Sequence, residues 1–148
     1  MIDGVLINQL NIIRDERGAV YHLLRNDNDG FFGFGECYVS EISVGITKGW
    51  KLHKLQTQNL VTIRGSVRLI IFDDRNESNT KGQIINLILG PNDSYLRVTV
   101  PPRVWYAFSC LSSFPSLLIN CADIPHKIDE AVTRPLYDSE LPYHLFVD

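Results

Sequence analysis

Short apolar runs separated by polar turns follow one another along most of the chain, from residue 5 to residue 122. Several alternate apolar and polar positions and are rich in β-branched residues, a pattern typical of strands. The segments that we expect to be strands are 5–13, 19–24, 35–44, 50–54, 60–63, 67–72, 83–89, 95–100, 103–111 and 116–122. Short strands at roughly ten-residue intervals predict an all-β sandwich or barrel.

Turn chemistry separates these strands. Residues 14–18 and 26–30 combine charged or Asn/Asp residues with glycine, and residues 64–66 read as a compact hairpin turn. Residues 123–148 contain three prolines, which favour an extended wrap over the single short helix that IDEAV (128–132) could form. No repeat or domain boundary is evident, so we expect one domain over residues 1–148 with a short C-terminal extension.

Composition narrows the class of protein. The 148 residues are 45% hydrophobic and 21% charged, which is typical of a soluble globular domain. The net charge of −3 without a basic block argues against nucleic acid as a partner. No run approaches the ~20 apolar residues of a membrane span, and the N-terminus lacks the features of a signal peptide. Three widely spaced cysteines fit a reducing cytoplasm better than a disulfide framework.

Two stretches have the spacing of the conserved cupin motifs without their usual metal ligands. The slots of the first motif, glycine–His–His–acid–glycine in the cupin pattern, hold Gly45, Lys51, His53, Gln58 and Gly65. The slots of the second, proline–glycine–His–Asn, hold Pro101, Arg103, Tyr106 and Cys110. Lysine, glutamine and tyrosine are poor ligands for divalent metals beside imidazole and carboxylate. We therefore expect no metal and no other cofactor.

The spacing of the motifs still carries geometric information. In a barrel of this type the ligand slots converge on one point of the interior, so Lys51, His53, Gln58 and Tyr106 should surround a common pocket. The alternative is that His53 is a hydrogen-bonded barrel histidine and Tyr106 is part of the core.

Residues 48–75, KGWKLHKLQTQNLVTIRGSVRLIIFDDR, resemble the central segment of nucleotide-sugar 3,4-ketoisomerases. Flanking segments are similar to dTDP-4-dehydrorhamnose 3,5-epimerase: DERGAVYHLLR (15–25), DDRNESNTKGQ (73–83) and VPPRVWYAF (100–108). The resemblance covers most of residues 4–125. It implies an RmlC-like cupin jelly roll (a double-stranded β-helix), a homodimer, and a nucleotide-diphosphate sugar as the molecule bound.

The resemblance also implies roles for individual residues. His53 matches the catalytic base, which removes a proton next to a 4-keto group, a task suited to imidazole with its pKa of about 6.5. Tyr38 matches an active-site tyrosine, and Lys48 replaces an arginine expected near the sugar or pyrophosphate. Lys51 replaces the first histidine of the motif, and Leu118 stands where the epimerase has its acid tyrosine. No residue matches the aspartate that orients the epimerase's histidine.

The leading hypothesis is thus a metal-independent epimerase or ketoisomerase acting on a dTDP-4-keto-6-deoxy sugar. His53 would be the base, Tyr106 or Tyr38 the proton donor, and Lys51 would stabilise the enolate. The candidate substrate-binding residues are Lys48, Arg25, Gln58, Arg103 and Trp105. Two alternatives stay open: a sugar-nucleotide-binding cupin without catalysis, and a metal-dependent dioxygenase-type cupin.

Overall fold

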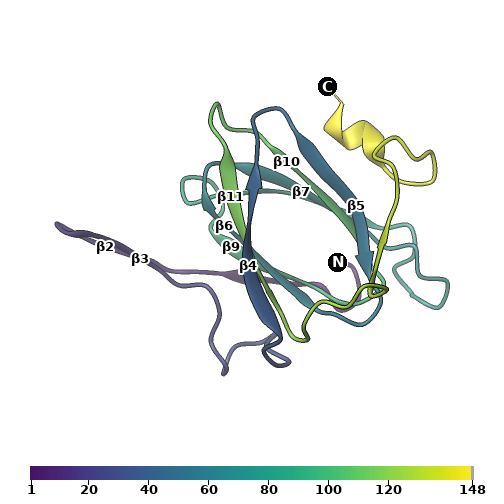
Figure 1. The fold of residues 1–148 in the computed structure, drawn as a ribbon, viewed down its shortest axis with the longest axis horizontal. Helices are drawn as coiled ribbons and strands as arrows, with labels where there is room; N and C mark the ends of the chain where they lie inside the picture. The colour runs from purple at the N-terminus through teal and green to yellow at the C-terminus, as the bar shows by residue number, and fades with distance from the viewer. Residues whose placement is uncertain (148) are drawn as a thin grey trace.

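The computed structural model describes residues 1–147 and is built from two five-stranded antiparallel sheets that face each other, with a separate two-stranded hairpin (Figure 1). The first sheet has the order β1-β9-β6-β11-β4 and the second β12-β5-β10-β7-β8. The strands are β1 Leu6–Gln9, β2 Ile12–Asp15, β3 Gly18–Tyr21, β4 Glu36–Ile42, β5 Thr47–His53, β6 Gln58–Arg64, β7 Val67–Phe72, β8 Ile84–Leu89, β9 Leu96–Val100, β10 Trp105–Cys110, β11 Ser116–Ala122 and β12 Ala131–Thr133. The all-β prediction is confirmed.

The expected strand at 5–13 is two strands with different partners. β1 pairs with β9 at the edge of the first sheet, whereas β2 pairs with β3 in the hairpin that projects from the body of the molecule (Figure 1). Ile13 and Val20 on this hairpin are 57% and 60% exposed. Alternation along a single run could not reveal the break, because both halves satisfy the same strand pattern.

The interior of the barrel is filled by alternate residues of the two sheets. Leu60 and Leu118 from the first sheet are buried with Leu69, Tyr106 and Phe108 from the second. β10 is buried along its whole length because the C-terminal segment covers the outer face of its sheet. This covering explains why β10 carries apolar side chains on both faces rather than on one.

The C-terminal segment is largely extended, as its prolines favoured. Residues 131–133 form β12 at the edge of the second sheet, so the short helix that 128–132 could form is absent. The one helix in the described residues is a single 3₁₀ turn, Tyr143–Phe146. Within residues 1–147, no helix is long and apolar enough to cross a membrane.

The glycine slots of the two motifs are turn positions with left-handed backbone. Gly45 and Gly65, in the glycine slots of the first motif, have φ of 71° and 77°. Arg103, in the glycine slot of the second motif, has φ of 63°. Glycine adopts these values without the Cβ clash that other residues meet, which explains its place in the pattern. The Arg103 N–H donates to the His53 carbonyl oxygen at 2.7 Å, so this turn is joined to the end of β5.

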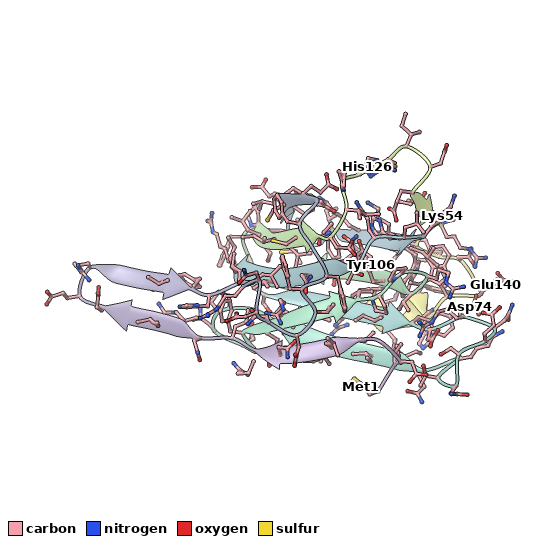
Figure 2. The ribbon with its side chains drawn as sticks, turned by 90° about the horizontal axis from the view of Figure 1, so that it is seen from below. Met1, Lys54, Asp74, Tyr106, His126 and Glu140 are labelled. Carbon is pink, nitrogen blue, oxygen red and sulfur yellow. The ribbon has the colours of Figure 1, made fainter. Side chains whose placement is uncertain are left out.

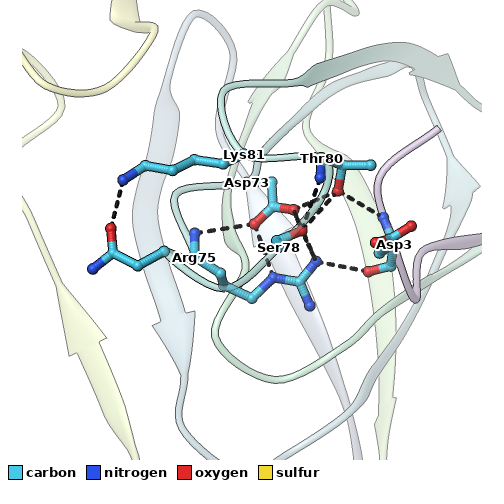
Figure 3. Close-up of polar contacts among 7 residues, drawn as sticks. Asp3, Asp73, Arg75, Ser78, Thr80 and Lys81 are labelled. Atoms are coloured by element: carbon cyan, nitrogen blue, oxygen red, sulfur yellow. Dashed lines mark hydrogen bonds and ion pairs between the residues drawn. The ribbon is translucent and has the colours of Figure 1, made fainter.

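The loop that follows β7 is organised around one buried carboxylate (Figure 3). Asp73 accepts hydrogen bonds from the side chains of Arg75, Ser78 and Thr80 at 2.6–2.9 Å. Arg75 also donates to the Asp3 carbonyl oxygen at 2.8 Å, which ties the loop to the N-terminus. The D-x-R-x-x-S-x-T pattern of residues 73–80 is therefore explained by loop structure.

Candidate active site

His53 is held between a carboxylate and a phenol inside the barrel. Its Nδ1 atom lies 2.5 Å from Glu130 Oε2, and its Nε2 atom lies 3.2 Å from the Tyr106 hydroxyl. The other carboxylate oxygen of Glu130 accepts the backbone N–H groups of Leu55 and Gln56 at 3.0 and 2.9 Å. His53, Glu130 and Tyr106 are 2%, 4% and 3% exposed, so the array is shielded from bulk water.

Strand pairing brings these three side chains together from distant parts of the sequence. His53 is the last residue of β5, and β12 adds to the edge of β5 with Ala131 opposite His53. Glu130 directly precedes Ala131 and thus reaches the imidazole. On the other side of β5, β10 runs antiparallel and places Tyr106 opposite Lys51.

The electrostatics favour neutral imidazole beside an ionised carboxylate. Burial lowers the pKa of His53, and the hydrogen bond to Glu130 opposes this only in part. Burial alone would raise the pKa of Glu130, but the N–H donors of Gln56 and Leu55, together with His53, hold it below its usual value. We therefore assign the imidazole proton to Nδ1, where it is donated to Glu130. Nε2 is then an acceptor for the Tyr106 hydroxyl.

Burial also raises the pKa of Tyr106 far above its ordinary value, so its phenol is neutral. With His53 accepting at Nε2, the hydroxyl proton of Tyr106 is committed to the histidine. One lone pair of the Tyr106 oxygen stays available to a molecule in the barrel.

A pocket of about 180 Å³ lies between the two sheets, next to Tyr106. Figure 2 shows Tyr106 within the body of the barrel. Its lining combines lysines, hydroxyl groups and apolar side chains: Tyr38, Ser40, Lys48, Gly49, Lys51, Leu60, Tyr106, Phe108, Leu118 and Asn120. Pockets for drug-sized ligands are typically about 300–1,000 Å³. This one has room for a single sugar-sized group, and a larger ligand would extend beyond it.

The opposite wall of the pocket presents a second tyrosine. Asn120 donates from Nδ2 to the Tyr38 hydroxyl at 2.8 Å and also to Gln58 Oε1. Tyr38 therefore acts as an acceptor toward Asn120, and its own proton is available to a ligand. Asn120 is 2% exposed, and its Oδ1 atom has no hydrogen-bond partner among the described residues. A buried, unsatisfied acceptor in a pocket wall suits a ligand hydroxyl.

Some of the candidate residues lie in or next to the barrel pocket, and others lie elsewhere on the molecule. Tyr38, Lys48, Lys51 and Tyr106 line the pocket, with His53 directly behind Tyr106. Lys48 donates to the Glu41 carbonyl oxygen at 2.6 Å. Gln58 lies behind the wall, where it donates to Gln56 and accepts from Asn120.

The other candidates lie elsewhere in the chain. Arg25 forms an exposed ion pair with Asp27, beside a separate polar cavity of about 550 Å³ near the N-terminal loops. Arg103 and Trp105 border a third, open depression on the outside of the barrel, and Trp105 lies under the guanidinium of Arg134. Within this chain, these three residues do not meet the barrel pocket.

Two residues of the site were missed by reasoning from the sequence. Glu130 takes the position expected of the missing aspartate, but it lies in a segment without strand periodicity, and only the addition of β12 to β5 reveals it. Asn120 lies two residues after Leu118 on β11, hence on the same face of the strand. That spacing was a usable signal, since Leu118 was already placed at the site.

Metal ligands are sparse around this pocket. In residues 1–147, no group of three or more His, Cys, Asp or Glu side chains is arranged to hold a metal ion.

Two facing antiparallel sheets that enclose a pocket and a buried Glu–His pair define a cupin barrel. The family model described as "FdtA: WxcM-like, C-terminal" matches residues 3–133, and the chain belongs to this family. The predicted resemblance to nucleotide-sugar cupins is confirmed, and so is the cupin jelly roll.

Known relatives agree with this assignment. A dTDP sugar isomerase from Desulfovibrio desulfuricans G20 is 36% identical, with a TM-score of 0.92 over 95% of this chain and 90% of that one. The probable low-salt glycan biosynthesis epimerase Agl13 of Haloferax volcanii is 29% identical over 80% of this chain and 77% of its own. The spore coat polysaccharide biosynthesis protein SpsL of Bacillus subtilis is 26% identical over 88% and 85%.

Proposed function

We propose that this protein is a nucleotide-sugar epimerase or ketoisomerase, which acts on a dTDP-4-keto-6-deoxy sugar by removing a proton next to the keto group. The observation that carries the proposal is the Glu130–His53–Tyr106 array against a pocket with room for one sugar ring. The names of the relatives, a dTDP sugar isomerase and a glycan biosynthesis epimerase, support the same class of reaction.

The chemistry follows from the charges around the pocket. A base for this reaction must be neutral at the working pH, and the lowered pKa of His53 keeps it so. Removing the proton moves an electron pair onto the keto oxygen, which becomes an enolate. Lys51 lines the pocket, and its positive charge stabilises that oxygen. Tyr38 then donates a proton to the enolate from the opposite wall.

The proposed reaction needs no metal. Both ring nitrogens of His53 are engaged, Nδ1 by Glu130 and Nε2 by Tyr106, so the imidazole offers no spare lone pair. The remaining slots of the cupin ligand set hold Lys51, Gln58 and Tyr106. If the enzyme did use a metal, the purified protein should contain about one equivalent of that metal per chain. Elemental analysis measures this content directly.

A homodimer and a cytoplasmic location complete the proposal. The projecting β2–β3 hairpin carries exposed apolar side chains at Ile13 and Val20, which a second copy of the chain could cover. The three cysteines are free thiols, as a reducing compartment maintains them.

Incubation with dTDP-4-keto-6-deoxyglucose in D₂O tests the activity. We expect deuterium to enter the sugar next to the keto group, and His53→Ala to abolish the incorporation. The second candidate, binding without catalysis, is favoured by the apolar Leu118 where the epimerase has an acid tyrosine. Retained binding of the nucleotide sugar without any deuterium would establish that alternative.

A further inference from the structure

The Tyr106 hydroxyl separates His53 from the pocket. Tyr106 lines the pocket, whereas His53 is 2% exposed and is not part of the lining. The Nε2 atom, the only ring nitrogen not facing Glu130, is covered by the Tyr106 oxygen at 3.2 Å. A sugar in the pocket therefore meets the phenol before it can meet the imidazole.

From this arrangement we infer that the sugar's proton reaches His53 through Tyr106, which is the catalytic residue in contact with substrate. The inference rests on the proposed function. In the step, the C–H bond next to the keto group breaks and its electron pair forms the enolate. The proton bonds to the Tyr106 oxygen while the phenol's own proton moves to His53 Nε2. Tyr106 ends as a neutral phenol, and His53 ends as an imidazolium beside the Glu130 carboxylate.

The two proton transfers must be coupled. A tyrosinate formed by losing the phenol proton first would be a buried anion, which burial strongly disfavours, as the raised pKa of Tyr106 indicates. A phenol that had gained a proton first would be a strong acid in the same dry site. When both protons move together, the only new charges are the enolate, near Lys51, and the imidazolium, next to Glu130.

His53 and Glu130 are positioning and proton-storing residues in this scheme. His53 fixes the direction of the Tyr106 hydroxyl by accepting its proton, and Glu130 fixes the tautomer that allows it. His53 remains the final acceptor of the proton, as in the proposed function, but the atom that touches the sugar is the oxygen of Tyr106.

The test compares Tyr106→Phe, His53→Asn and the double variant for loss of the substrate proton from dTDP-4-keto-6-deoxyglucose. Tyr95→Phe is the matched control, because Tyr95 is also buried and donates its hydroxyl proton to a backbone carbonyl, far from the pocket. We expect about 100-fold or greater loss in each single variant, a typical size for general acid–base catalysis. The double variant should lose no more than either single variant, and binding of dTDP should be unchanged in all of them.

A merely structural role of Tyr106 would not produce the isotope effect that the relay requires. In the parent enzyme, proton removal should be slower in D₂O than in H₂O, because the phenol proton moves in the same step. Near-parental proton removal by Tyr106→Phe, or losses that multiply in the double variant, would overturn the relay while leaving the proposed function intact. No proton removal by the parent enzyme would overturn both.

Discussion

His53 Nδ1 and Glu130 Oε2 lie 2.5 Å apart, although the two residues are 77 positions apart in the sequence. Both side chains are buried, each with 2% of its surface exposed. A buried carboxylate at this position holds the imidazole in one tautomer and favours its protonated form. It also means that the C-terminal segment is part of the site and does more than cover the barrel.

Replacing the carboxylate by an amide should therefore impair catalysis. We expect Glu130→Gln to lower kcat/KM by about 100-fold or more, since the amide neither stabilises the imidazolium nor enforces the Nδ1–H tautomer. Nitrogen NMR of His53 in the substrate-free protein should show the changed tautomer. Glu140→Gln, at an exposed position in the same segment, is the control. Parental activity in Glu130→Gln would refute the role assigned to this residue.

The pH dependence of activity should reflect the lowered pKa of His53. Below that pKa the imidazole is protonated and cannot accept a proton, so kcat/KM should rise with pH through an acidic limb whose midpoint lies below 6.5, the ordinary pKa of histidine. The positive charge of Lys51 contributes to the lowering. Lys51→Gln should move the acidic limb to higher pH and also reduce the plateau, because the enolate loses its cation. An unmoved limb would argue against this electrostatic coupling.

The polarity of Asn120 should determine what Tyr38 can do. In Asn120→Asp, a carboxylate replaces the amide that donates to Tyr38, so the tyrosine should turn its proton toward the new acceptor and away from the ligand. We expect activity to fall about 10- to 100-fold, equivalent to about 1–3 kcal/mol for one misdirected buried hydrogen bond. Asn76→Asp, in an exposed loop, is the control. If both variants keep parental rates, Tyr38 is not the donor.

Asp73 should contribute to stability and not to chemistry. We expect Asp73→Asn to lower the free energy of unfolding by about 2–4 kcal/mol, because Arg75, Ser78 and Thr80 lose a fully buried carboxylate. The exposed neighbour in Asp74→Asn is the control, and urea unfolding is the measurement. Activity per folded molecule should be unchanged in both variants.

The same carboxylate predicts a pH window for stability. Burial alone would raise the pKa of Asp73, but the hydrogen bonds from Arg75, Ser78 and Thr80 lower it well below the unfolded value of 3.8. Its contribution should thus be complete above about pH 4 and should be lost as the pH falls toward the folded pKa. Asp73→Asn should flatten the stability curve in this acidic range.

Arg103 should tolerate glycine better than alanine. A φ of 63° costs a residue with a side chain about 1–2 kcal/mol, and Arg103→Gly would relieve this strain. The greater freedom of glycine in the unfolded chain offsets part of that gain. We expect Arg103→Gly to be more stable than Arg103→Ala by up to about 1 kcal/mol in thermal unfolding. Equal loss of dTDP binding in both variants would show that the arginine side chain contacts the nucleotide.

The class of fold and the positions of Lys51, His53 and Tyr106 on strands beside one pocket could be predicted from the linear pattern of residues. Alternating β-branched runs can bury one face only as strands, and the motif spacing already placed Lys51, His53 and Tyr106 on strands that face one pocket. The glycine slots were equally readable, because a left-handed turn excludes most other residues. Each strand pattern, motif spacing and glycine slot is defined by residues a few positions apart, so it can be recognised in the sequence.

The charges and hydrogen-bond directions of the site, in contrast, arise only when distant segments of the chain come together in the folded protein. Glu130 directly precedes β12, an edge strand of three residues that is too short to show a periodic pattern. Its carboxylate pairs with His53, which is far away in the sequence. The order Glu130–His53–Tyr106 depends on which hydrogen bonds form after the sheets close, and so does the hydroxyl proton that Tyr38 keeps free when it accepts from Asn120. Burial and these hydrogen bonds together then set the pKa of each group. A sequence lists the titratable residues, but their protonation states depend on water exclusion and on partners brought together from distant strands.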